Sequence, residues 1–265
     1  MKDNDSTNQV RVSVATYNQV IFPHPQNQMW MLALEREATI QKNGRGNVRA
    51  QPFGGAIRIL NPEPLQKIIG QIRFDSERSR HDQDFRILIP PSKWELVKEY
   101  CLYHLKNQDD VELESTPRRE LVEEFEEALQ VHLQADQYTI QPIGFVIEDK
   151  PVRTSNADAR GHLTVRLYEI FKVHIVDLNL CEAILAASER YSDHDLERLA
   201  VEDFQTGGKG HAHSVLSVPL NLVLESYLAL SPDMRFRKIL VKNYTLDESV
   251  LSILEDVDVP QYQRL

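Results

Sequence analysis

The residues with the clearest chemical potential are carboxylates concentrated between positions 120 and 149. That stretch has eight acidic residues and no lysine or arginine: Glu120, Glu123, Glu124, Glu126, Glu127, Asp136, Glu148 and Asp149. The glutamates at 120, 123, 124 and 127 recur every three or four residues, so they would line one helix face, opposite the apolar stripe, where like charges repel. A hard divalent cation such as Mg²⁺, which takes oxygen ligands, would relieve that repulsion. The pattern therefore indicates a metal site, with a solvated acidic helix face as the alternative.

Arginine precedes this cluster. Arg119 lies one helical turn before Glu123, so its guanidinium can form a forked ion pair with that carboxylate. Such a pair would orient Glu123 and leave the other glutamates for a metal.

The run from Arg119 to Glu124, R-E-L-V-E-E, resembles the R-E-U-x-E-E core of the Nudix hydrolase motif, with Leu121 as the bulky aliphatic residue. Gly54 and Gly55, which follow Pro52, look like the glycine pair that begins the same motif. In the family the two parts lie close together, whereas about 60 residues separate them here. The resemblance therefore implies a motif split by a long insertion.

For the fold, the resemblance implies an α+β protein with a Nudix-like α/β/α sandwich and a mixed sheet. We expect a single Nudix-like domain over 1–265, with a helical insertion at about 56–108 and a C-terminal helical extension at about 219–265.

For the chemistry, the resemblance implies Mg²⁺- or Mn²⁺-dependent hydrolysis of a nucleoside diphosphate linked to another moiety. Glu123 and Glu124 would be metal ligands, and Glu120 a third ligand or the residue that positions water. Arg119 would complete the catalytic set, and Gly54 and Gly55 would contact the metal and substrate.

Two other interpretations remain open. Val111 stands where the family has an earlier glutamate, and Glu126 stands where it has a glycine, so the chain could be a catalytically inactive nucleotide-binding or regulatory module. Alternatively, the acidic helix could be a surface for a basic protein partner.

A second candidate site is the segment 206–213, TGGKGHAH. Its glycines would let backbone N–H groups approach a phosphate, Lys209 would add positive charge and contact substrate, and His211 and His213 could share a metal. The G-x-x-x-x-G-K-[ST] spacing of a P-loop is absent. A plain loop is the alternative.

Weaker signals surround these sites. The acidic pairs at 148–149 and 202–203 are candidates for a general base, and solvated turns are the alternative. The arginines near the glycine pair could clamp a phosphate: Arg45, Arg49, Arg58 and Arg86.

Composition excludes several classes of protein. The formal net charge is −10, which argues against a general nucleic-acid binder. The chain has two cysteines, Cys101 and Cys181, too few for a disulfide framework, so a cytoplasmic location is expected. No apolar run has the length of a membrane span, so no membrane association is expected. We expect a small-molecule partner of the nucleotide diphosphate type; the oligomeric state stays open, with a homodimer as one option.

The elements that must position these residues follow from apolar periodicity. Strands are expected at 10–14, 29–36, 52–60, 84–90, 139–149 and 162–176. Helices are expected at 61–72, at 92–107 with a capping box of Ser92 and Glu95, after Pro117, at 179–190 and at 219–230. The polar segment 41–51 is expected to be a loop, and the segment 191–213 is polar and Gly-rich at its end, where 206–213 is expected to be a loop. Because strands and helices mix without a regular βαβ rhythm, the pattern favours an α+β fold.

Overall fold

The computed structural model describes residues 9–40, 46–108, 110–114, 116–153, 161–222, 239–241 and 244–246. Contacts divide the chain into two compact units, each assembled from separate segments. Unit 1 contains 1–16, 55–117 and 144–169, and unit 2 contains 17–54, 118–143 and 170–265. The stretch expected to be an insertion, 56–108, therefore lies wholly in unit 1.

Three long strands contribute residues to both units: β1 (Val10–Pro23), β7 (Tyr138–Arg153) and β8 (Leu163–Ile175). In unit 1 the start of β1 pairs antiparallel with β6 (Arg86–Ile89), which pairs in turn with β5 (Arg73–Phe74). The remaining elements of unit 1 are α1 (Pro62–Ile69), α2 (Glu77–Asp82), a 3₁₀ turn η2 (Pro91–Lys93) and α3 (Trp94–Asn107).

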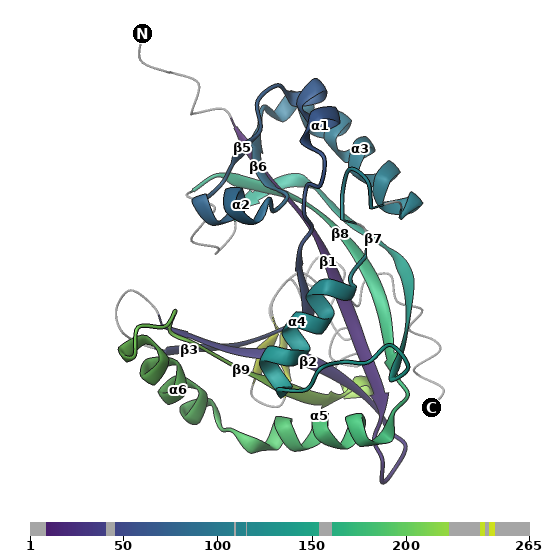
Figure 1. Ribbon diagram of the computed structural model, residues 1–265, viewed down its shortest axis with the longest axis vertical. Coiled ribbons are helices and arrows are strands. Elements are labelled where there is room, and N and C mark those ends of the chain that lie inside the picture. Colours follow the sequence, from purple (N-terminus) through teal and green to yellow (C-terminus); the bar gives the residue numbers. More distant parts are fainter. Residues whose placement is uncertain are drawn as a thin grey trace. The chain divides into compact units, whose positions relative to one another are not determined.

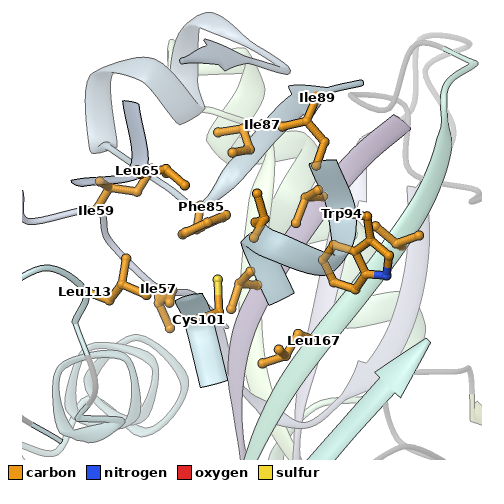
Figure 2. Packing of buried hydrophobic residues seen from close by; sticks show 14 of the residues in the cluster. Ile57, Ile59, Leu65, Phe85, Ile87, Ile89, Trp94, Cys101, Leu113 and Leu167 are labelled. Carbon is orange, nitrogen blue, oxygen red and sulfur yellow. The ribbon is translucent and has the colours of Figure 1, made fainter. Parts of the chain in front are cut away.

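The core of unit 1 forms where α3 meets these strands. Leu65, Phe85, Ile87 and Cys101 point toward a common centre, and none of them is more than 1% exposed (Figure 2). Burial raises the pKa of the Cys101 thiol far above its ordinary value. Cys101 is therefore a core residue, as its position on the apolar stripe of the helix predicts.

Unit 2 is built on the strand β2 (Trp30–Ile40). It pairs antiparallel with β3 (Gly46–Gln51), with the end of β1 and with β9 (His211–Pro219). Strand β11 (Tyr244–Leu246) joins β3 in parallel and pairs antiparallel with β10 (Ile239–Val241), so the sheet is mixed. Strand β4 (Phe53–Ala56) begins at the end of a unit 2 segment.

Helices cover both faces of this sheet (Figure 1). Helix α4 (Arg118–Leu129) lies over one face of β2 and β9, and α5 (Leu178–Arg190) and α6 (Asp193–Gln205) lie over the other. The alternation of side chains along β2 explains this layering. Ala38 packs against Leu196 and Ala200 of α6, whereas the odd-numbered Ala33 and Glu35 face the side of α4.

The observed fold is mixed α and β with a mixed sheet, which confirms the coarse fold class. The expected strands at 10–14, 29–36, 84–90, 139–149 and 162–176 are present, as are the helices at 61–72, after Pro117 and at 179–190. In the part of the chain that the structure describes, no helix combines the length and apolar character needed to cross a membrane.

Four local expectations are wrong. The polar segment 41–51 contains the strand β3, whose residues pair with β2. The expected loop at 206–213 contains the start of β9, and the polar segment before it forms α6. Ser92 does not cap α3, because the prolines before it start a 3₁₀ turn and Lys93 takes the cap position without a side-chain hydrogen bond. In the expected C-terminal helical extension, residues 220–222 are helical, but residues 239–241 and 244–246 form strands. Most other residues of 219–265 lie outside the described residues.

Candidate functional site

Helix α4 is held on the sheet by its apolar side. Leu121 and Phe125 are completely buried, and the ring of Phe125 lies 4.6 Å from that of Phe53, centroid to centroid. Phe53 begins β4, and Gly54 follows it directly. The aromatic contact therefore brings the backbone at Gly54 next to the acidic side of α4.

The glycine and the acidic helix meet through a hydrogen bond. The backbone N–H of Gly54 donates to Oε2 of Glu124 at 2.5 Å. Gly54 has φ 138°, a conformation that L side chains rarely adopt, so glycine suits this position. The two parts of the motif that the resemblance pairs are therefore in contact in unit 2, whereas Gly55 belongs to the next segment, in unit 1.

The acidic side of α4 is turned partly toward the sheet. Burial raises the pKa of Glu124 well above its ordinary value, and the carboxylates of Glu35 and Glu120 raise it further. The Gly54 N–H opposes this shift, and Glu127 adds to it. The expectation that all four glutamates line a face opposite the apolar stripe is therefore wrong for Glu124, which lies at the edge of the buried side.

Arg119 makes the predicted ion pair. Its guanidinium lies 3.1 Å from Oε2 of Glu123 and 2.5 Å from Oε1 of Glu120. The Glu123 side chain is 56% exposed, whereas Glu120 is 19% exposed. One arginine thus holds two of the three glutamates of the predicted catalytic set, and Gly54 contacts the third.

The sheet under α4 adds two carboxylates that the sequence interpretation missed. Glu35 and Glu37 are alternate residues of β2, 2% and 5% exposed. Nδ1 of His213 lies 2.7 Å from Oε1 of Glu35, and its Nε2 lies 3.9 Å from Oε2 of Glu127. Burial lowers the pKa of His213, but the carboxylates of Glu35, Glu37 and Glu127 outweigh burial and raise it overall.

The segment 206–213 is a turn from α6 into β9, with both histidines on the strand. The carboxylate of Asp203 accepts hydrogen bonds from the backbone N–H groups of Gly210 (2.8 Å) and His211 (3.4 Å). Those N–H groups are the ones a phosphate would need. Lys209 lies exposed in the turn, and its substrate contact stays a prediction.

Most of the weaker candidates have structural partners. Glu148 pairs with Arg166 at 2.5 Å, and Asp149 accepts hydrogen bonds from Trp94 and Lys98 at 2.8 and 2.9 Å. Arg86 pairs with Asp84, and Arg49 with Glu37. Arg45 lies outside the described residues.

Models of known protein families, curated proteins and solved structures were compared with this chain, and none of them matches it. The case for a function therefore rests on the geometry of the site.

Proposed function

We propose that the protein is a divalent-metal-dependent hydrolase of a nucleoside diphosphate linked to another moiety, with a Nudix-like α/β/α sandwich in unit 2. The observation that carries the proposal is the hydrogen bond from Gly54 N–H to Glu124 Oε2. It joins two parts of the motif that are 70 residues apart.

The donor set on α4 fits Mg²⁺ or Mn²⁺. Glu120, Glu123 and Glu124 offer only oxygen ligands, as these hard cations require. Burial, and after it the neighbouring carboxylates of Glu35 and Glu120, raise the pKa of Glu124, and a bound cation would offset the repulsion among these carboxylates. Glu120, Glu123 and Glu124 would hold the cation, which would supply Lewis-acid activation of the diphosphate and of the attacking water.

The protein's own residues have separate roles in this proposal. Arg119 orients Glu120 and Glu123 through its two ion pairs. The N–H of Gly54 fixes the Glu124 carboxylate. Phe125 anchors the helix on the sheet through its ring contact with Phe53. The conformation at Gly54 brings backbone, without a side chain, next to the acidic cluster, where a substrate diphosphate can approach.

The test is turnover of a panel of nucleotides with Mg²⁺ or Mn²⁺. The panel includes ADP-ribose, NADH, diadenosine polyphosphates and nucleoside triphosphates. We expect the double variant Glu123→Gln, Glu124→Gln to lose at least about 100-fold in rate, because it removes metal ligands. The matched control is Glu126→Gln, on the same helix, whose carboxylate is 60% exposed. Equal activity in all three proteins would overturn the proposal.

A nucleotide-binding module without turnover is the second candidate, and one observation favours it. Val111 stands where the family has an earlier glutamate, and the glutamates that follow it have partners in unit 1. Glu112 lies 3.4 Å from Nδ1 of His104, and Glu114 accepts a hydrogen bond from the backbone N–H of Arg58 at 3.3 Å. A panel member that raises the unfolding temperature but is not hydrolysed would favour this function.

A further inference from the structure

Two carboxylates and two imidazoles face one another across neighbouring strands of unit 2. Glu35 and Glu37 alternate on β2, and His211 and His213 alternate on β9. The register sets Glu37 opposite His213. Because alternate residues of a strand point to the same face, all four side chains lie on one side of the sheet.

Each carboxylate is held at both oxygens. Oε1 of Glu37 lies 2.8 Å from Nδ1 of His211, and Oε1 of Glu35 lies 2.7 Å from Nδ1 of His213. The Oε2 atoms accept hydrogen bonds from β3, Glu37 from Arg49 at 2.7 Å and Glu35 from Gln51 at 2.5 Å. The arrangement repeats along the strands: a residue of β3, a carboxylate of β2 and an imidazole of β9.

Donor atoms in this cluster are close enough to share one ion. Glu37, His211 and His213 each offer one ligand atom, and these three atoms lie within 4.8 Å of one another. The centroids of the two imidazole rings are 6.1 Å apart. Tetrahedral Zn²⁺, with bonds of about 2.0 to 2.2 Å, needs ligand atoms roughly 3.4 Å apart.

The charge of the cluster also suits a dication. Glu35, Glu37 and Glu127 supply three carboxylates, and Arg49 is the cation paired with them in the described residues. With both histidines neutral, two negative charges remain without a matching cation in that part of the chain. Of the two unmatched carboxylates, Glu35 is almost fully buried, so water screens its charge poorly, whereas Glu127 is 61% exposed.

We propose that Glu37, His211 and His213 bind a borderline transition-metal dication of the Zn²⁺ class. Two imidazoles and one carboxylate suit such ions, whereas Mg²⁺ and Ca²⁺ prefer oxygen alone. Glu35, on Nδ1 of His213, orients that ring as carboxylates do for metal-bound histidines. Metal entry would replace the His211–Glu37 hydrogen bond, and the neutral His211 ring would carry its proton on the nitrogen that does not bind the metal. The three ligands of this site differ from the predicted ligands Glu120, Glu123 and Glu124, and the proposal does not depend on the proposed hydrolase.

The experiment titrates the metal-stripped full-length chain with Zn²⁺ by calorimetry and with Co²⁺ by visible absorption. We expect one ion of micromolar affinity or tighter, and a loss of at least about tenfold in His211→Gln and His213→Gln. His81→Gln, at an imidazole that is 89% exposed in unit 1, is the matched control. Circular dichroism in EDTA checks that each variant is folded.

Unchanged Zn²⁺ affinity in the two variants would overturn the proposal. So would loss of Zn²⁺ binding in Glu123→Gln, Glu124→Gln together with retention in His211→Gln, because the ion would then use α4. Hydrolysis with Mg²⁺ is measured on the same proteins. If the protein binds Zn²⁺ through His211 but hydrolyses no nucleotide, the result counts against the proposed hydrolase alone. If it hydrolyses a nucleotide but does not bind Zn²⁺ through His211, the result counts against this metal site alone.

Discussion

The backbone N–H of Gly54 donates a hydrogen bond to the carboxylate of Glu124, a residue 70 positions later in the chain. This contact joins a backbone conformation that favours glycine, at Gly54, to the partly buried carboxylate of Glu124 in unit 2. The energetic consequences of that arrangement can be measured without knowing the substrate.

Glu124→Gln should separate stability from metal binding. Burial, and to a smaller extent the nearby like charges, raise the pKa of Glu124, so its ionised form destabilises the fold once the pH exceeds the ordinary carboxyl pKa. Glutamine keeps an oxygen that can accept from Gly54. We expect the metal-free variant to unfold about 2 to 4 °C higher at pH 7, a gain of about 1 kcal/mol, and to bind Mg²⁺ or Mn²⁺ at least about tenfold more weakly. Thermal unfolding in EDTA and metal titration measure the two effects. A lower unfolding temperature would contradict this account of Glu124.

Phe125→Ala should destabilise unit 2 strongly. Phe125 is fully buried and its ring contacts Phe53, so truncation leaves a cavity under the acidic helix. We expect a loss of about 3 to 5 kcal/mol in the free energy of unfolding, measured with denaturant. Leu178→Ala, at a side chain on α5 that is 60% exposed, should change it by no more than about 0.5 kcal/mol. Similar losses in both variants would mean that Phe125 does not anchor α4.

Glu169 should make the protein less stable as the pH rises. Burial raises the pKa of Glu169 to about 8, although a hydrogen bond with Gln108 opposes the shift. The folded state therefore holds a proton that the unfolded chain releases near its ordinary pKa of 4.5. Stability contributed by the protonated form is complete below that value and declines as the pH rises to about 8, by on the order of 2 to 5 kcal/mol.

Denaturant midpoints measured from pH 5 to pH 9 test this dependence. In Glu169→Gln, which cannot ionise, the decline attributed to Glu169 should disappear. A wild-type profile that persists unchanged in the variant would assign the decline to other groups.

Gly208→Ala should disturb the turn between α6 and β9. A Cβ at this position would overlap with Oδ1 of Asp203, the side chain that also accepts from the Gly210 N–H. We expect a loss of about 1 to 3 kcal/mol from this overpacking. In an Asp203→Ala background the same substitution should cost clearly less, because the obstructing carboxylate is gone. Additive losses in the double-mutant cycle would show that the two residues do not interact in this way.

Much of the fold was predictable because several elements carry strong apolar patterns. Leu121 and Phe125 mark the buried side of α4, and Val10 and Val12 mark β1. Helix α6 was missed because its buried side consists of only Leu196 and Ala200. The signal that could have found it is the capping box of Ser192 and Asp195, which begins the helix.

The candidate site was only half predictable. The contact of Gly54 with Glu124 follows the order of a known motif, so a resemblance could suggest it. Glu35 and Glu37 reach His211 and His213 through strand register, and 178 positions separate Glu35 from His213. The alternation E-x-E and H-x-H was visible in the sequence, but nothing local indicates which two strands pair.

The interleaving of the two units has a consequence for how this chain can be divided. The backbone passes from one unit to the other after Thr16, Gly54, Pro117, Ile143 and Glu169. No single break in the backbone therefore separates the units. A fragment ending at Glu169 would hold all of unit 1, but also β2 and α4 without the strand β9 that pairs with β2. Truncation would separate strands that pair with one another, and excising unit 1 would require rejoining the chain at two points.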